Sequence, residues 1–232
     1  MKIGILQTGQ APEAMREAPG DYPALFERLL AGHGFDFESW HVEAMAFPVS
    51  VHDADGWLIT GSRHGVYEDQ PFIAPLEQFI RDALAADVPV VGICFGHQIM
   101  AQALGGKVEK YEGGWAVGAQ QYRFGTETLT LNAWHQDQVT EPPAGARVLA
   151  SSDFCAYAAL GYGKIGYSVQ PHPEFDDSFI AGLIELRGRS LVPAPQIAQA
   201  EAQLGGQRDS ALLAARIAAH FKAHAISRPE VS

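Results

Sequence analysis

Apolar residues in the first 105 positions follow two alternating spacings. Short continuous apolar runs predict buried strands, whereas apolar residues that recur every three or four positions predict helices. We expect strands at residues 2–7, 35–42, 57–59 and 88–93, and helices at 22–30, 72–84 and 97–104. Asp21 precedes the first helix as a cap, and Gly105 with Gly106 ends the third. This order predicts a mainly parallel sheet with helices on both faces.

The second half of the chain has a different pattern. Short β-like runs predict antiparallel strands added to the same domain, at residues 120–124, 128–131, 147–150 and 165–170. Helical spacing returns at residues 178–186 and at about 209–224. Residues 188–196 hold two prolines and are expected to form a loop. Without a repeat or a linker, we expect one α/β domain over residues 1–225, followed by a loose tail at 226–232.

Composition narrows the classes of function. The 232 residues are 47% hydrophobic and 19% charged, which is typical of a folded globular protein, and the formal net charge is -11. An acidic surface disfavours nucleic acid and anionic lipid as partners. Two cysteines are too few for a secreted disulfide scaffold, and no apolar stretch approaches the roughly 20 residues that cross a membrane. A cytoplasmic protein without a signal peptide is the simplest expectation.

The segment around Cys94 has the G-x-C-x-G form of a nucleophile elbow, between an apolar strand and a helix. Gly92 and Gly96 leave room beside the nucleophile, where a Cβ would clash. Cys94 then lies at a helix N-terminus, whose dipole favours the thiolate, and the amide of Phe95 would donate to an oxyanion. The other cysteine, Cys155, lies in an apolar run and is expected to be inert core.

A cysteine nucleophile needs a base, and His172 is the best placed of the nine histidines. It follows an apolar strand, where a parallel sheet forms its sites, and a proline on each side stiffens the segment. Glu174 projects to the same side of an extended chain and would hold the other ring nitrogen. The alternatives are a structural histidine beside a solvated glutamate, or a metal pair. Because the chain has no HExxH or CxxC spacing, we expect no metal.

Residues 161–166 also satisfy the pattern G-x-G-x-x-G. The dinucleotide-binding fingerprint requires a strand before this pattern and a helix after it. Here an apolar strand follows, so we expect a hairpin turn. Since the chain has no P-loop either, we expect no cofactor.

Residues 92–98 and 171–174 together resemble the two signatures of class I glutamine amidotransferase domains, in the same order along the chain. The likeness covers about residues 1–187 and is nearest to single-domain members, including γ-glutamyl peptidases. It implies a three-layer, flavodoxin-like α/β fold and a catalytic triad of Cys94, His172 and Glu174. The oxyanion and substrate-binding residues that it implies are Gly61, Ser62, Phe95, Gln98, His135, Gln136 and Asp137.

The same resemblance implies a mechanism. Cys94 would attack the side-chain carbonyl of glutamine and form a γ-glutamyl thioester, while His172 protonates the departing ammonia. Water would then release glutamate. Gln98 and the backbone of residues 136–137 would hold the amino-acid end of the substrate, and His135 would shape that loop.

Residues 61–63 read Gly-Ser-Arg, where many members of the family have Gly-Gly-Pro. Ser62 can still supply a backbone N–H to an oxyanion, but its side chain and that of Arg63 lie at the expected pocket mouth. This departure makes a larger γ-glutamyl compound a candidate substrate, with Arg63 or His64 as a contact for its carboxylate. A solvated loop charge is the alternative interpretation.

Two enzymatic functions fit these residues. The first is a glutaminase that would donate ammonia to a separate synthetase, because the chain has no ATP-binding motif of its own. The second is a stand-alone γ-glutamyl peptidase or hydrolase that releases an amine or a peptide. A binding module with a dead site is a third possibility, against which the intact Cys, His and Glu argue.

Overall fold

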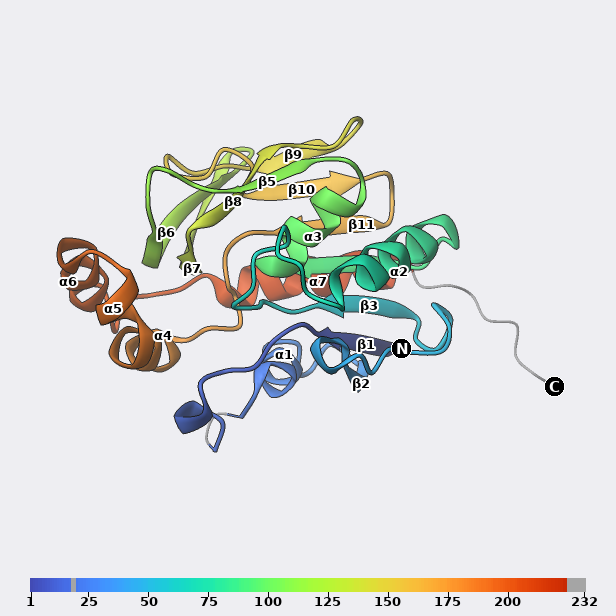
Figure 1. The fold of residues 1–232 in the computed structure, drawn as a ribbon, viewed down its shortest axis with the longest axis horizontal. Coiled ribbons are helices and arrows are strands. Elements are labelled where there is room, and N and C mark those ends of the chain that lie inside the picture. Colours follow the sequence, from blue (N-terminus) through green and yellow to red (C-terminus); the bar gives the residue numbers. More distant parts are fainter. Residues whose placement is uncertain (18–19, 225–232) are drawn as a thin grey trace.

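The core of the computed structural model, which describes residues 1–17 and 20–224, is a seven-stranded sheet (Figure 1). Its strands are β1 Lys2–Gln7, β2 Asp36–His41, β3 Gly56–Ile59, β4 Val90–Ile93, β9 Arg147–Ala150, β10 Ala159–Tyr162 and β11 Gly166–Val169. They run in the order β2-β1-β3-β4-β11-β10-β9. The first five are parallel, and β10 is antiparallel to both of its neighbours. The predicted, mainly parallel sheet is confirmed.

Helices cover both faces of this sheet. The four that do so are α1 Tyr22–Leu29, α2 Ile73–Ala85, α3 Phe95–Ala103 and α7 Ser210–Ala223. Because strand side chains alternate, successive residues face separate cores. Trp57 and Ile59 of β3 pack with α2 and α3, whereas Leu58 packs with α1 and α7. The three predicted layers and the last predicted helix are thus confirmed, while the predicted tail at residues 226–232 lies outside the described residues.

Two smaller antiparallel pairs lie beside the main sheet (Figure 1). They are formed by β5 Lys107–Lys110 with β8 Asp137–Glu141, and by β6 Ala116–Phe124 with β7 Glu127–His135. Antiparallel additions were predicted, but β5, β8 and β10 were not. The strand expected at 165–170 also differs from the prediction, because β11 pairs in parallel with β4. The glycine pattern at 161–166 forms the β10–β11 hairpin turn, as expected.

The C-terminal part of the chain is more helical than its sequence indicated. It contains α4 Asp177–Leu183, a π-helical turn at Ile184–Gly188, α5 Arg189–Leu191 and α6 Ala194–Ala202. The prediction of a loop at 188–196 is therefore wrong. Pro193 caps α6 and Pro195 lies in its first turn, where the missing N–H of proline has no helical partner to lose. No helix among the described residues has the length and apolar composition needed to cross a bilayer.

Candidate active site

The turn between β4 and α3 carries Cys94 at the predicted bend. Its backbone has a φ of 54° and a ψ of -102°, a conformation that a residue with a Cβ adopts only with strain. A Cβ on Gly92 would lie 2.3 Å from the carbonyl oxygen of Gly96, and a Cβ on Gly96 would lie 2.4 Å from that of Ile59. The tight turn therefore requires both glycines, and it leaves Cys94 directly before the first turn of α3.

His172 and Glu174 lie in the loop that follows β11. Nδ1 of His172 lies 2.7 Å from Oε1 of Glu174, and both side chains are buried. The ring of His172 stacks on that of Phe175, with 4.0 Å between centroids. The backbone N–H of His172 donates to the carbonyl oxygen of Asn132 on β7, and the Asn132 side chain donates to the carbonyl oxygen of Phe175. Hydrogen bonds with Asn132 and stacking on Phe175 thus hold the loop and the imidazole in place.

Gly61, at the end of β3, lies against both of these groups. A Cβ on Gly61 would lie 3.0 Å from Cε1 of His172 and 3.9 Å from Cβ of Cys94. Three segments that are far apart in sequence therefore converge at one point. The carboxyl ends of neighbouring parallel strands meet there, as the fold requires.

The charges at this point favour a protonated imidazole. Burial alone would lower the pKa of His172, but the negative charges of Cys94 and Glu174 outweigh burial and raise the pKa to about 10. A hydrogen bond to Glu174 also holds Nδ1, which leaves Nε2 for proton exchange. The arrangement suits an imidazolium beside a thiolate, which is the reactive form of a cysteine nucleophile.

Two backbone amides are available for an oxyanion. In the described part of the chain, neither the N–H of Phe95 nor that of Ser62 donates a hydrogen bond. Thr8 holds the loop that carries Ser62, because its hydroxyl lies 3.0 Å from the carbonyl oxygens of Thr60 and Gly61. Sequence reasoning missed Thr8 and Thr60, which are both fully buried. Their polarity next to an apolar strand was the available signal.

A line of amide groups connects the predicted substrate loop to the thiol. Nε2 of Gln98 donates to the carbonyl oxygen of Asp137 at 2.8 Å and to Oε1 of Gln170 at 3.1 Å. Nε2 of Gln170 in turn lies 3.5 Å from Sγ of Cys94. Gln170 was not predicted as a site residue, although it directly precedes the histidine motif. It is fully buried and provides a donor to the sulfur.

The other predicted loop residues lie at the ends of β7 and β8. Nδ1 of His135 lies 3.2 Å from the carbonyl oxygen of Asp137, so this ring shapes the loop. Burial lowers the pKa of His135 to about 3, and the ring is neutral. The amide of Gln136 donates to the carbonyl oxygen of Tyr111, and the Asp137 carboxylate accepts from the hydroxyl of Tyr67 across the pocket mouth.

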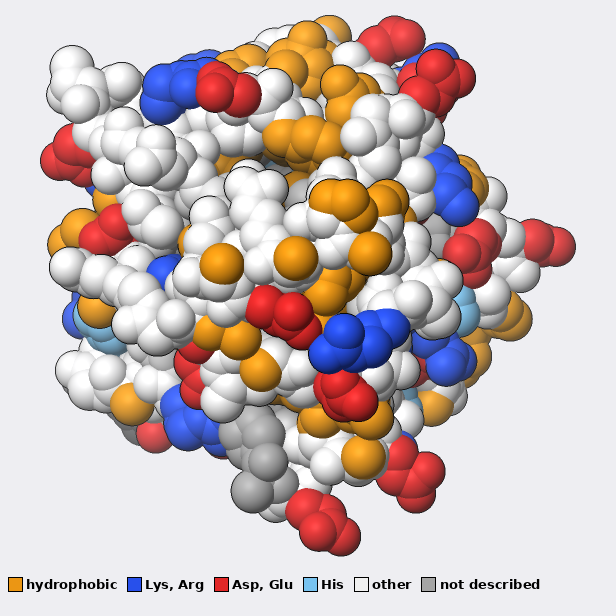
Figure 2. Space-filling model, turned by 90° about the vertical axis from the view of Figure 1, so that its left-hand side faces the viewer, with side chains coloured by type: hydrophobic (Ala, Val, Ile, Leu, Met, Phe, Trp, Pro, Cys, Tyr) orange, Lys and Arg blue, Asp and Glu red, His pale blue; other side chains and the backbone are white. Residues whose placement is uncertain are grey.

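A cavity of about 450 Å³, a size typical of small-molecule sites, is bordered by most of the predicted site residues: Ser62, Cys94, Gln98, His135, Gln136, Asp137 and His172. One wall is the loop after β3, from Ser62 to Glu68, and a second wall consists of Gln98, Lys110, His135, Gln136 and Asp137. The third wall was not predicted and consists of Tyr22, Trp115, Trp134, Phe175, Leu183, Arg187 and Leu191. Figure 2 looks onto the end of the molecule where α4–α6 lie, and it shows apolar side chains among charges of both signs.

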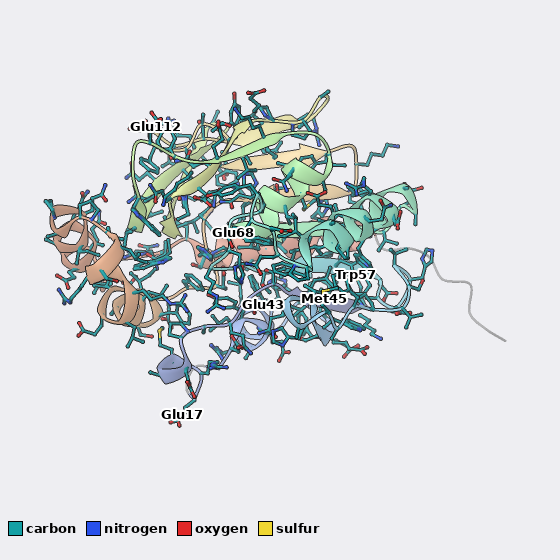
Figure 3. All side chains as sticks on the ribbon, in the orientation of Figure 1. Glu17, Glu43, Met45, Trp57, Glu68 and Glu112 are labelled. Atoms are coloured by element: carbon teal, nitrogen blue, oxygen red, sulfur yellow. The ribbon has the colours of Figure 1, made fainter. Side chains whose placement is uncertain are left out.

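Of the two residues considered as carboxylate contacts at the pocket mouth, His64 is already engaged. Its Nε2 lies 3.1 Å from Oε1 of Glu43, and its Nδ1 lies 3.0 Å from Oε2 of Glu68 (both carboxylates are labelled in Figure 3). Arg63 is 63% exposed and lies 3.8 Å from Glu43. His64 is therefore not free to bind a substrate carboxylate, and Arg63 has the character of a solvated loop charge.

Cys155 and His97 are unsuited to catalysis. Burial raises the pKa of Cys155 to about 12, and its side chain is 1% exposed. Burial lowers the pKa of His97, next to the elbow, to about 3, and its Nδ1 lies 2.7 Å from the hydroxyl of Ser168. In the described part of the chain, no group of three or more His, Cys, Asp or Glu side chains is arranged to hold a metal ion.

Comparison with known proteins places this geometry in context. Residues 28–179 match the family model described as glutamine amidotransferase class-I. γ-Glutamyl peptidase 4 of Arabidopsis thaliana is 30% identical over 75% of this chain and 75% of its own length. The glutamine-hydrolysing GMP synthase of Vibrio vulnificus is 35% identical over 66% of this chain but only 30% of its own length. A glutamine amidotransferase structure from Methylobacillus flagellatus superposes with a TM-score of 0.78 at 20% identity, covering 99% of this chain and 97% of the other.

Proposed function

This chain belongs to the class I glutamine amidotransferase family, and on that premise we propose that it hydrolyses γ-glutamyl amide bonds. In this proposal Cys94 is the nucleophile, His172 the acid and base, and Glu174 the carboxylate that orients the imidazole. The observation that carries it is the buried His172–Glu174 pair, 2.7 Å apart, facing a thiol on a strained elbow inside a cavity.

The first half of the reaction forms a thioester. The thiolate of Cys94 attacks the δ-carbonyl carbon of the γ-glutamyl group, and the carbonyl oxygen becomes an oxyanion held by the amides of Phe95 and Ser62. As the C–N bond breaks, His172 transfers its Nε2 proton to the departing nitrogen. The products of this half are a γ-glutamyl thioester on Cys94 and a free amine, or ammonia when the substrate is glutamine.

The second half returns the enzyme to its starting state. Water enters the position left by the amine, and the now neutral His172 takes a proton from it. The resulting hydroxide attacks the thioester carbonyl, the C–S bond breaks and glutamate leaves. Cys94 departs as a thiolate beside the regenerated imidazolium. Glu174 holds the ring in one orientation through both transfers and never becomes the proton carrier.

The amino-acid end of the substrate is assigned to the cavity wall that contains Gln98 and the loop at residues 136–137. Gln98, Gln136 and Asp137 border the cavity there, and their polar groups suit an α-amino acid. Lys110 lies on the same wall and adds a positive charge.

A second candidate function is supply of ammonia to a separate synthetase. The observation in its favour is the match to a GMP synthase over 30% of that protein's length, since the matched part lacks the rest of that enzyme. Incubation of the purified protein with glutamine and with γ-glutamyl dipeptides, followed by measurement of glutamate, separates the two functions. Release of glutamate from dipeptides alone would exclude ammonia supply.

Three alanine variants test the proposed roles. Cys94→Ala is expected to remove turnover and leave the fold intact, and His172→Ala to reduce kcat more than Glu174→Ala does, because the orienting carboxylate carries no proton. Alkylation supplies an independent measurement. If Cys94 reacts with iodoacetamide no faster than a simple thiol at pH 7, the activated nucleophile is wrong, whatever the substrate.

A further inference from the structure

Two aromatic rings and a cation lie beside the imidazole of His172 in the same cavity. Phe175 stacks on His172 with 4.0 Å between centroids, and the ring of Tyr22 lies 6.0 Å from that of Phe175, tilted by 35°. Arg187 borders the same cavity as Tyr22, and its charge acts on the Tyr22 hydroxyl. The cavity that contains the reacting imidazole therefore also contains a guanidinium.

The guanidinium of Arg187 has no ion pair or side-chain hydrogen bond within residues 1–17 and 20–224. It is nevertheless close to a buried hydroxyl: burial raises the pKa of Tyr22, and the charge of Arg187 opposes that rise. Arg189, two residues further on, is different, because Glu185 and Glu201 bind it at 3.1 Å and 3.0 Å. The acidic side chains of this segment thus neutralise the outer arginine and leave the cavity arginine free.

The backbone that carries Arg187 is a π-helical turn, Ile184–Gly188. Such turns are rare and occur often at functional sites, because the extra residue redirects side chains. Here the turn follows α4, which supplies Leu183 to the cavity wall. A cation on this turn therefore lies on fixed secondary structure instead of a surface loop.

The position of the cation relative to the chemistry indicates what it would bind. His172 protonates the departing nitrogen, so whatever is attached to that nitrogen extends along the His172 side of the cavity. Glutamine has nothing attached there. We propose that Arg187 and the hydroxyl of Tyr22 bind a carboxylate on the departing amine, and that the preferred substrates are γ-glutamyl amino acids or peptides. This inference rests on the proposed γ-glutamyl hydrolysis.

Electrostatics makes such a cation necessary for an anionic substrate. The chain has a formal net charge of -11, which repels anions at long range. A planar guanidinium can bind a carboxylate through two parallel hydrogen bonds, and a tyrosine hydroxyl can add a third. The apolar side chains of Leu183, Leu191 and Trp134 border the same wall and leave space for the side chain of the departing amino acid.

Two substrates of nearly equal size test the inference, γ-glutamylglycine and its neutral counterpart γ-glutamylglycinamide. The wild-type protein is expected to have a kcat/KM about 10- to 100-fold higher for γ-glutamylglycine, the range for a charge-assisted contact. In Arg187→Met this preference is expected to disappear, and in Tyr22→Phe to fall by about threefold. Arg189→Met is the matched control and is expected to retain the full preference.

The possible outcomes distinguish failure of the carboxylate site from failure of the proposed γ-glutamyl hydrolysis. If the wild type hydrolyses both substrates and Arg187→Met leaves their ratio unchanged, the carboxylate site is refuted while γ-glutamyl hydrolysis stands. If the wild type hydrolyses neither substrate nor glutamine, the proposed function itself fails. Should Arg187→Met not fold, Arg187→Lys keeps a charge without the planar fork, and a preference reduced to an intermediate value supports the site. An unaltered preference in the lysine variant refutes bidentate binding by the arginine.

Discussion

The backbone at Cys94 predicts an unusual order of stability between two inactive variants. At most helical or strand positions, glycine is less stable than alanine. Cys94, however, has a φ of 54° and a ψ of -102°, a region that glycine occupies freely and residues with a Cβ do not. Cys94→Gly is therefore expected to be more stable than Cys94→Ala.

The size of the difference follows from two opposing terms. A residue with a Cβ in such a conformation costs about 1–3 kcal/mol, and the alanine variant retains this strain while the glycine variant loses it. Glycine costs about 0.5–1 kcal/mol because the unfolded chain has more freedom. Loss of the sulfur is common to both variants and cancels. The net expectation is a free energy of unfolding about 1 kcal/mol higher for glycine, or about 2–4 °C in Tm for a chain of this length.

Urea unfolding followed by tryptophan fluorescence measures the difference, since the chain has four tryptophans. The matched control is Ala215→Gly, at an exposed position in the middle of α7, which is expected to lose about 1 kcal/mol relative to the wild type. The test is whether replacing alanine by glycine raises the free energy of unfolding at position 94 and lowers it at the control position. If Cys94→Gly were less stable than Cys94→Ala by the amount seen in the control, the elbow would carry no backbone strain and this reasoning would be refuted.

Three further predictions test the site. The charges of Cys94 and Glu174 raise the pKa of His172 to about 10 against the effect of burial, so kcat/KM is expected to fall as pH rises through about 10, where the imidazolium is lost. Since this pKa is raised from 6.5, the contribution of His172 to stability is complete below pH 6.5 and is lost as pH rises through about 10. Glu174→Gln should shift the pH profiles of both kcat/KM and stability to lower pH. Profiles that do not shift would contradict the assignment. Gln170→Leu removes a donor 3.5 Å from the sulfur and should slow alkylation by iodoacetamide about two- to tenfold, whereas an unchanged rate would show that the contact has no effect. Gly96→Ala would place a Cβ 2.4 Å from a carbonyl oxygen of β3, and urea unfolding should show a loss of about 3 kcal/mol; a wild-type curve would mean that the elbow can widen.

Periodicity was sufficient to predict six of the seven strands of the main sheet and its flanking helices, but not β10. Long apolar repeats, such as those of α2 and α7, have one dominant cause, which is burial of one face. The segment at 188–196 failed because proline was taken as a sign of a loop. Pro193 and Pro195 instead begin α6, and tertiary packing, including its contact with β6, stabilises that helix. Short strands with a mostly exposed pattern, such as β5, have no sequence signal of this strength.

The predicted site residues lie in recognisable sequence motifs, whereas the unpredicted ones do not. Cys94 and His172 lie in motifs whose local chemistry has few alternative explanations. Tyr22 has the spacing of a core residue in an amphipathic helix, and Arg187 has the composition of a helix surface. Neither residue's role is visible without the fold, because 165 positions separate them and only the packing of α1 beside the C-terminal segment brings them together.

The division of the cavity also has a consequence for how substrate choice varies in the family. The match to the class I model spans residues 28–179 and contains Cys94, Gln98 and His172. Tyr22 and Arg187 lie outside it, one on each side, yet both border the same cavity. The residues proposed for chemistry on the γ-glutamyl group therefore lie in the common part of the domain, and those proposed to hold the departing amine lie in the flanking segments. Because these segments pack onto the sheet without forming the elbow, substitutions in them can change the accepted amine while the thiol and imidazole keep their geometry.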